Sequence, residues 1–224
     1  DGRWEDVTIL RISGREAISQ LFAYELELVM TDAAADLDGR AVPGADVTIV
    51  FEEEGVETRR VHGAIGRVTD NLDVNDERRT YRLTVHPRVH RMNLIETQEI
   101  HLDSTIPQIV EKKLEMHGFQ PADYELRLIG DYPAREIVTQ YGETDVAFIS
   151  RLTEHAGISF YFEHEGGVDK IVFTDHPAGF SAVPHHEEAV FHGRGETMGV
   201  HQLKLVKEAI PARYFVQDYN YRTK

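Results

Sequence analysis

The chain has 224 residues, enough to bury a sizeable core in one large or two smaller domains. Its 24 Lys and Arg against 39 Asp and Glu give a net charge of -15, which argues against a nucleic-acid partner because phosphate contacts need clustered basic side chains. The lack of cysteine excludes disulfides and thiol nucleophiles. We expect no signal peptide because the sequence does not open with a cationic start followed by an apolar core, and no membrane span because no apolar run of about 18 residues occurs.

The segment 18–29 predicts a β-strand with one solvated face. Phe22, Tyr24, Leu26 and Leu28 project to one side, and small or acidic residues project to the other, which is the two-residue period of a strand. The same alternation recurs in two later segments, residues 47–51 and 81–85. We therefore expect the first part of the chain to consist of short strands.

Glycines and polar residues separate these strands. Residues 53–55 predict a turn, and residues 71–76 predict a polar hairpin loop. The small residues at 63–66 predict a bend or bulge, the feature with which a sheet curls. Because strand follows strand with no intervening helix, we expect residues 1–95 to form a small antiparallel β-barrel.

Residues 105–118 predict an amphipathic helix. Thr105, or Ser104 before it, can cap the first turn, and Gln108 is placed to complete a capping box with Thr105. Apolar residues recur on one face at helical spacing, and Gly118 follows as the expected stop. The charged residues are predicted on the solvated face: Glu111, Lys112, Lys113 and Glu115.

Residues 132–165 predict a strand, a second helix and another strand in succession. Thr144 can accept a hydrogen bond from the first-turn amides, and Asp145 lies where the helix dipole favours a carboxylate. Gly157 provides the left-handed stop, and the aromatic run 158–163 then alternates with the period of a strand. The helix is expected to dock on the sheet that this strand helps to build.

The fold class predicted by these elements is α+β and mainly β. We assign residues 96–196 to a mixed α/β segment with two helices, which includes a further strand at 170–175. Residues 197–224 return to a two-residue alternation, which predicts further strands. The expected order is a small antiparallel β-barrel over residues 1–95, the mixed segment, and these further strands.

A long specific pattern begins at Gln140 and reads QYGETDVAFISRLTEHAGISFYFEHE. It resembles a block of the VgrG spike proteins of type VI secretion systems, and more distantly the tail-hub proteins of contractile bacteriophages. The segments RISGREAISQLFAYELEL from Arg11 and VHGAIGRV from Val61 strengthen the resemblance. The matching residues of the long pattern are Gln140, Tyr141, Glu143, Thr144, Asp145, Phe148, Arg151, Leu152, Glu154, Gly157, Ile158, Phe162, His164 and Glu165.

The resemblance implies a structural protein without enzyme activity or cofactor. It also implies that residues 197–224 form the first strands of a second, incomplete barrel. It implies a homotrimeric hub that joins an inner tube of an Hcp-like protein to a needle-like tip and contacts baseplate components. Such a spike assembles in the bacterial cytoplasm and is then secreted or delivered into target cells together with effectors. A contractile phage tail or baseplate hub is the close alternative. A metal-dependent hydrolase or effector built around the histidines is the rival from another class.

Twelve histidines raise the question of a metal site. His86 and His90 have the spacing of a helical ligand pair, but Pro87 argues against a helix there. His164 lies between two glutamates at a strand end, and a further cluster lies in a loop, formed by His185, His186, Glu187 and Glu188. We expect solvated or hydrogen-bonded histidines and no metal.

Other residue groups that could carry chemistry also have structural explanations. Glu143 and Asp145 could form an acid and base pair, but their place at a helix start predicts a capping role. Residues 13–15 predict a turn and not a nucleophile site, and no nucleophile elbow or phosphate-binding glycine loop occurs. The aromatic residues 160–162 alternate faces, which favours core and interface roles. We therefore predict no catalytic, cofactor-binding or metal-binding residues.

Overall fold

The computed structural model describes residues 4, 6–30, 37, 39, 41–71, 79–182, 190–193, 200–209, 211–213 and 215. The chain divides into two compact units, Asp1–Phe180 and Ser181–Lys224. Every helix and strand assigned within these residues lies in the first unit. In the described part of the second unit an isolated bridge pairs Phe191 with Val200. The incomplete barrel expected over residues 197–224 stays a prediction, as do the domain boundaries.

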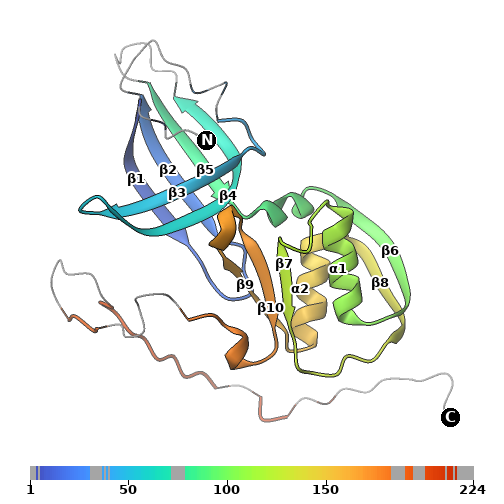
Figure 1. Cartoon of the computed structure of the whole chain (residues 1–224). Coiled ribbons are helices and arrows are strands. Elements are labelled where there is room, and N and C mark those ends of the chain that lie inside the picture. The colour runs from blue at the N-terminus through green and yellow to red at the C-terminus, as the bar shows by residue number, and fades with distance from the viewer. Residues whose placement is uncertain are drawn as a thin grey trace, which may run out of the picture. The chain divides into compact units, whose positions relative to one another are not determined.

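Five antiparallel strands form a curled sheet in the first unit (Figure 1). Tyr24 and Phe51 lie on strands that are not neighbours, yet their ring centroids are 6.3 Å apart across the concave face. The predicted antiparallel, mainly β fold is confirmed. The strand order is β1-β2-β5-β4-β3, so β1 and β3 are the edge strands of this sheet. The strands are β1 (Val7–Arg15), β2 (Ala23–Met30), β3 (Asp46–Glu53), β4 (Val56–Asn71) and β5 (Thr80–His86).

The alternation of β2 is confirmed by burial. Tyr24, Leu26 and Leu28 are buried in the core of the curled sheet, and Ala23 and Glu25 are exposed. Burial of a large apolar side chain stabilises the fold by roughly 1.5–3 kcal/mol, so the sheet curls towards its apolar face. The core therefore lies on the concave face of the sheet.

The predicted turn and bulge are both present. Glu54 and Gly55 join β3 to β4 with φ angles of 51° and 80°. The pairing of β4 with β5 shifts between Ile65 and Arg67, and a Cβ on the intervening Gly66 would lie 2.5 Å from the His86 ring. Glycine is therefore required where the sheet bends. Of the predicted loop 71–76, residue 71 ends β4 and the rest lies outside the described residues.

The turn predicted at residues 13–15 is wrong. These residues belong to β1 and pair with β2, with Gly14 opposite Tyr24. The glycine serves a close approach and not a turn, because a Cβ at this position would lie 2.2 Å from the Tyr24 ring. A glycine between polar neighbours has the same local signal in both situations.

The rest of the first unit, which we call the mixed segment from here on, contains the two predicted helices between two small sheets (Figure 1). Side chains from both helices and from both sheets share one core, which includes Val138, Phe148 and Phe173. One sheet has the order β7-β10-β9 and the other pairs β6 with β8. The elements are β6 (Glu96–Ser104), α1 (Ile106–Met116), β7 (Tyr124–Arg127), β8 (Arg135–Thr144), α2 (Asp145–His155), β9 (Ser159–Glu163) and β10 (Lys170–Thr174), with short 3-10 turns η1 (Arg88–Asn93), η2 (Glu165–Gly167) and η3 (Pro177–Gly179).

Both helices begin and end at the predicted residues. Thr105 and Gln108 form the capping box of α1, and the Thr144 hydroxyl accepts a hydrogen bond from the Ala147 amide at the start of α2. Gly118 and Gly157 follow the helices with φ angles of 79° and 71°. Local hydrogen bonding thus set both helix boundaries.

Strand β6 is not predicted by the sequence pattern. Its inward residues include Glu99 and the buried His101, and its outward residues include the exposed Ile100 and Leu102. This is the reverse of the usual arrangement of polar and apolar faces, so alternation alone gives no indication of which side is buried.

A small aromatic group joins the two cores of the first unit. Phe162 on β9 packs against both cores, and its ring lies 5.2 Å from that of Phe22 in an edge-to-face arrangement. The Ser19 amide donates to the Phe160 carbonyl at 2.8 Å beside this contact. The curled sheet and the mixed segment are therefore held together through side chains and backbone.

Candidate functional site

The histidines singled out in the sequence have structural contacts. The rings of His86 and His90 stack with centroids 4.2 Å apart, and His164 Nδ1 accepts a hydrogen bond from the His62 amide at 3.1 Å. Within the described residues no group of three or more His, Asp or Glu is placed to hold a metal ion. The loop cluster of residues 185–188 lies outside those residues, so the absence of a metal stays a prediction.

Asp145 lies at the centre of a buried polar cluster. Its carboxylate accepts hydrogen bonds from Lys113 Nζ at 2.9 Å, Gln140 Nε2 at 2.8 Å and Thr97 Oγ1 at 3.1 Å, and it pairs with His117 Nε2 at 2.7 Å. The predicted capping role of this carboxylate is therefore wrong, because its oxygens point to neighbouring elements. Its position in the first turn of α2 still favours a negative charge.

Lys113 is the buried cation of this cluster, which we call the Asp145 cluster. The predicted exposure of Lys113 is wrong, since it is 1% exposed. Its ammonium group also lies 2.8 Å from Glu99, and Lys112 binds the other Glu99 oxygen at 2.7 Å. A buried ammonium is tolerated here because two carboxylates neutralise it and accept hydrogen bonds from it.

The electrostatics of the Asp145 cluster indicate a structural role. Hydrogen bonds from Lys112 and Lys113 lower the pKa of Glu99 to about 2. Burial acts to raise the pKa of Asp145, but its hydrogen bonds from Gln140, Lys113 and His117 outweigh burial and hold that pKa well below its usual range. A general base needs a pKa nearer to neutral pH and an accessible lone pair, so neither carboxylate is suited to acid–base catalysis at neutral pH.

Glu143 is engaged elsewhere and does not form a pair with Asp145. Its carboxylate receives two hydrogen bonds from Arg151, at 2.6 and 3.1 Å. The capping role predicted for it is wrong as well, because Thr144 already caps α2 and Glu143 reaches past it to the second turn. The two carboxylates therefore stabilise α2 by different contacts.

The predicted core role of the aromatic run on β9 is confirmed for Phe160, and its predicted interface role stays a prediction. Phe160 is buried among the side chains of the mixed segment, and Phe162 links the two cores. The Tyr161 hydroxyl projects to the other face, where its single hydrogen is shared between two acceptors, Glu163 at 2.9 Å and the Gly179 carbonyl at 3.0 Å. No flat platform for a ligand results from this arrangement of β9.

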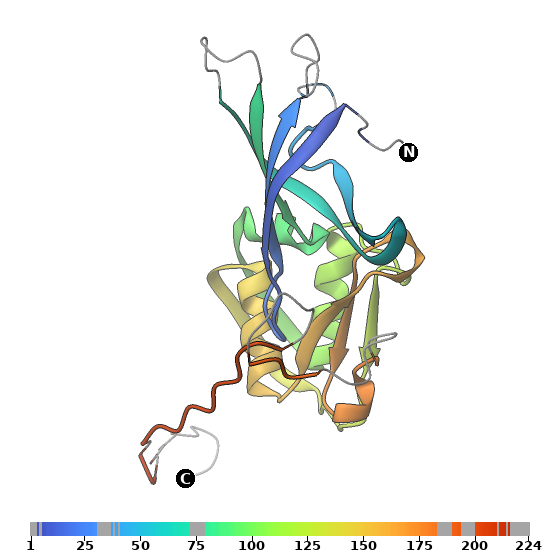
Figure 2. The same cartoon turned by 90° about the vertical axis from the view of Figure 1, so that its left-hand side faces the viewer.

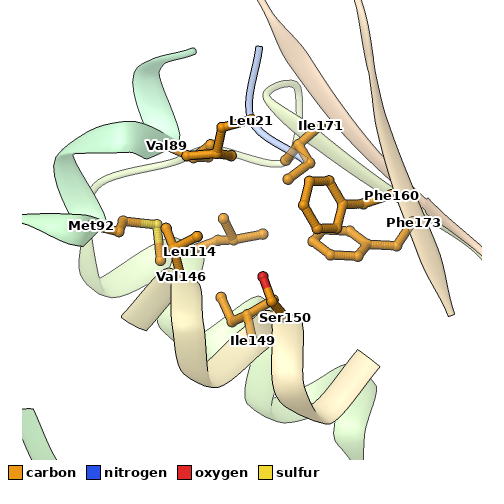
Figure 3. A pocket seen from close by; sticks show the side chains of 10 residues that line it. All are labelled: Leu21, Val89, Met92, Leu114, Val146, Ile149, Ser150, Phe160, Ile171 and Phe173. Atoms are coloured by element: carbon orange, nitrogen blue, oxygen red, sulfur yellow. The ribbon is translucent and has the colours of Figure 1, made fainter. Parts of the chain in front are cut away.

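A cavity of about 20 Å³ lies inside the mixed segment (Figure 3). Its lining is almost wholly apolar and includes Leu21, Met92, Phe160 and Phe173, with the hydroxyl of Ser150 as the polar exception. A cavity of this size has room for one water molecule at roughly 10–15 Å³, and not for a substrate. It is therefore a packing defect of the core.

Strand β1 provides the first of two exposed apolar surfaces. Figure 2 views the curled sheet from the side of β1, the dark blue strand in front. Its residues are exposed on both faces, and Ile9, Leu10 and Ile12 are 51%, 60% and 37% exposed. Its outer edge pairs with no strand among the described residues. We call Ile9, Leu10 and Ile12 the edge surface, which combines unpaired backbone with apolar side chains, as in strands that pair with another chain.

The outer face of the β6 and β8 pair is the second exposed apolar surface. Leu102 pairs with Ile137, and these side chains are 63% and 58% exposed. Ile100 and Tyr141 lie on the same face with exposures of 59% and 76%. No charged side chain interrupts these central positions of the register, which is unusual for the surface of an acidic protein.

Sequence reasoning did not single out either surface. The run of residues 7–12, VTILRI, contains the apolar residues of the edge surface, and its density of β-branched side chains is the signal that could have predicted a strand. Exposure could not have been predicted, because it depends on what the rest of the sheet leaves uncovered. The candidate functional site is thus a protein interface, with the edge surface as its best-defined part.

The geometry can be set beside known proteins. The profile of the family described as phage tail baseplate hub (GPD) matches residues 15–224. The chain belongs to this family. The hub chain is also 36% identical over 176 residues to the type VI secretion system spike protein VgrG5 of Pseudomonas aeruginosa, covering 78% of this chain and 22% of that protein. It is 28% identical over 224 residues to spike protein VgrG1c of the same organism, which covers 97% of this chain and 30% of that protein.

A solved structure agrees with these relationships. The E. coli c3393 protein, a component of the type VI secretion system with structural similarity to the T4 bacteriophage tail proteins gp27 and gp5, matches the hub chain with a TM-score of 0.71. The identity is 31%, over 81% of this chain and 49% of that one. The resemblance to VgrG spike proteins is therefore confirmed, and the hub chain spans less than a third of the length of those two curated relatives.

The relatives' names describe structural parts of a phage-tail-like machine. Within the described residues of the hub chain, no helix combines the length and apolar character that crossing a bilayer needs.

Proposed function

We propose that the hub chain is part of a homotrimeric spike of a type VI secretion system, which joins the inner tube to the needle-like tip. The observation that carries this proposal is the edge surface on β1, in a chain that belongs to the baseplate hub family and is related to VgrG spike proteins. An open edge strand with apolar side chains is suited to pairing with a copy of itself around a symmetry axis.

The proposed partners follow from the same position in the machine. An Hcp-like tube protein on one side, baseplate components around it and secreted effectors would contact the assembled trimer. The spike would be assembled in the bacterial cytoplasm and then be secreted or delivered into target cells. The burial of Asp145 and the ion pairs of Asp145 and Glu99 support an assembly role without catalytic turnover.

A contractile phage tail hub is the second candidate. The family description itself refers to phage tails, and the fold is shared with tail proteins. The neighbouring genes separate the two candidates, because sheath and tube genes without a capsid gene indicate a secretion system, and a capsid gene beside them indicates a phage.

Gene deletion in the source bacterium tests the proposed function. Deletion is expected to abolish release of the tube protein into the medium, and the intact gene is expected to restore it. A gene carrying Leu10→Asp should fail to restore release although the protein accumulates normally, because the charge disrupts the edge surface. Undiminished release after deletion, in a strain with no second spike gene, would contradict the proposal.

A further inference from the structure

We propose that His62 and His164 form an acid-sensitive joint that holds the curled sheet against the end of β9. This histidine joint consists of the two rings and Thr48, and it goes beyond the assembly role proposed above. The two histidines are 102 residues apart in the chain, and their ring centroids are 6.2 Å apart.

The hydrogen bond between the two histidines requires a neutral His164 ring. The His62 amide donates to His164 Nδ1 at 3.1 Å, so that nitrogen must carry a lone pair and the ring proton must lie on Nε2. On protonation Nδ1 gains a hydrogen that would point at the His62 N–H, and two donors would then face each other. His62 Nδ1 also lies 2.9 Å from Thr48 Oγ1, which fixes the second ring on β4.

The surroundings cannot easily accept the added charge. Nε2 of both rings is buried without a hydrogen-bond partner within the described part of the chain. Burial is the main cause that lowers the pKa of His164 to about 4, and burial also lowers the pKa of His62. The ring of His164 additionally packs edge-on against Phe22 at 5.4 Å, which keeps water away from one side.

The nearby acidic groups are mostly occupied by arginines. Near His164, Glu16 is held by Arg59 at 2.6 Å and by the Tyr24 hydroxyl. Beside His62, Asp169 accepts hydrogen bonds from the amide and guanidinium of Arg88. The other charged groups that act on His62 are Arg60 and Glu57 on the same strand, which are paired with each other. The neighbouring charges therefore offer little compensation to a protonated histidine.

A polar cavity makes opening of the joint feasible. It measures about 50 Å³ and is lined by Asp46, Thr48, His62, Arg88 and Asp169, among others. Since one water needs roughly 10–15 Å³, water can enter beside His62 when the ring becomes charged. The Ser19 to Phe160 backbone hydrogen bond and the Phe22 to Phe162 contact lie next to the joint and would hold the two parts together.

The direction of the pH dependence follows from linkage. The pKa of His164 in the closed joint is about 4, below the ordinary value of 6.5, so the open joint binds more protons between these values. Closure is fully favoured above pH 6.5 and weakens as the pH falls towards 4. After allowance for partial exposure, we expect closure to weaken roughly tenfold or more across this interval.

NMR on the full chain tests the joint directly. The ring of His164 should titrate near pH 4, and the exchange protection factor of the His62 amide should fall roughly tenfold or more as the pH is lowered from 6.5 to 4. The Phe148 amide in α2 should keep its protection, since Phe148 is fully buried away from the joint. Titration of His164 near 6.5 without an effect on His62, or simultaneous loss of protection at both amides, would overturn the proposal.

Two variants complete the test. His164→Asn retains an acceptor close to the position of Nδ1 but cannot be protonated in this range, so the His62 amide should stay protected at pH 4. His155→Asn removes an exposed histidine from α2 and should leave the wild-type pH profile unchanged. If His164→Asn does not fold, the wild-type protein still tests the proposal, through the titration of the His164 ring and the pH dependence of His62 amide protection. Equal acid sensitivity of wild type and His164→Asn would refute the joint.

Discussion

The edge surface of β1 and the Asp145 cluster differ in how many of their polar groups are paired and how many of their side chains are buried. In the Asp145 cluster, Lys113 on α1 and Asp145 on α2 are buried and paired inside the mixed segment, and the partly exposed Glu99 on β6 pairs with Lys113. On β1 both faces and one backbone edge are open within the described residues. The difference indicates that the Asp145 cluster satisfies its own charges within the mixed segment, whereas the edge surface leaves backbone groups and apolar side chains open to a partner.

The largest effect is expected from breaking the Asp145 cluster. Lys113→Met removes the buried cation and leaves Asp145 and Glu99 without their main counter-charge, so the free energy of unfolding should fall by about 3 kcal/mol. Chemical denaturation of the wild type and the variant measures this difference. The matched control is Lys112→Met, whose side chain is 52% exposed and which should cost less than about 1 kcal/mol.

The same cluster predicts a pH dependence with a definite sign. The pKa of Asp145 is lowered in the folded state, so its contribution to stability is present above the ordinary aspartate value near 4 and is lost as the pH falls below it. Denaturation at several pH values should show a steeper decline in wild type than in Lys113→Met. Parallel curves would show that Lys113 does not stabilise the carboxylate.

A smaller effect is expected where β1 joins the sheet. Gly14→Ala places a Cβ against the Tyr24 ring and should lower the free energy of unfolding by about 1–3 kcal/mol, with loss of amide protection in β1. Gly39→Ala is the control, because nothing lies within 4 Å of a Cβ at that position. Unchanged protection of β1 in Gly14→Ala would mean that the strand does not need this close approach.

The smallest effect on stability, and the largest on assembly, is expected at the edge surface. Leu10→Asp changes a side chain that is 60% exposed and should alter the free energy of unfolding by less than about 0.5 kcal/mol. The variant protein should nevertheless lose its association with other copies of itself. Val56→Asp, at a residue that is 67% exposed away from β1, should leave association unchanged, and equal loss in both variants would remove the special role of β1.

The contrast between these regions also explains what the sequence could predict. The strand β2 and both helices were predictable because their alternation, caps and glycine stops are local signals. Strand β1 was partly missed because Gly14 gave the signal of a turn, and β6 was missed because its polar residues face inward. Local patterns identify an element, but they do not show which of its faces another element will cover.

The candidate site was less predictable than the fold. Asp145 was recognised at a helix start, but its partner Lys113 lies 32 residues earlier and is brought to it only by the packing of α1 against α2. The exposure of Ile9 and Leu10 likewise results from the way in which the sheet curls. Interactions between distant residues require the tertiary structure, whereas caps and turns do not.

The most direct test is the mass of the protein in solution, measured by light scattering over a range of concentrations for the 224-residue chain and for the complete gene product. We expect the complete product to have three times the mass of its own chain, and the 224-residue chain of 25.5 kDa to be monomeric or to approach three copies with rising concentration. Leu10→Asp should shift both towards the monomer. A stable monomer for both wild-type proteins at high concentration would contradict the hub assignment.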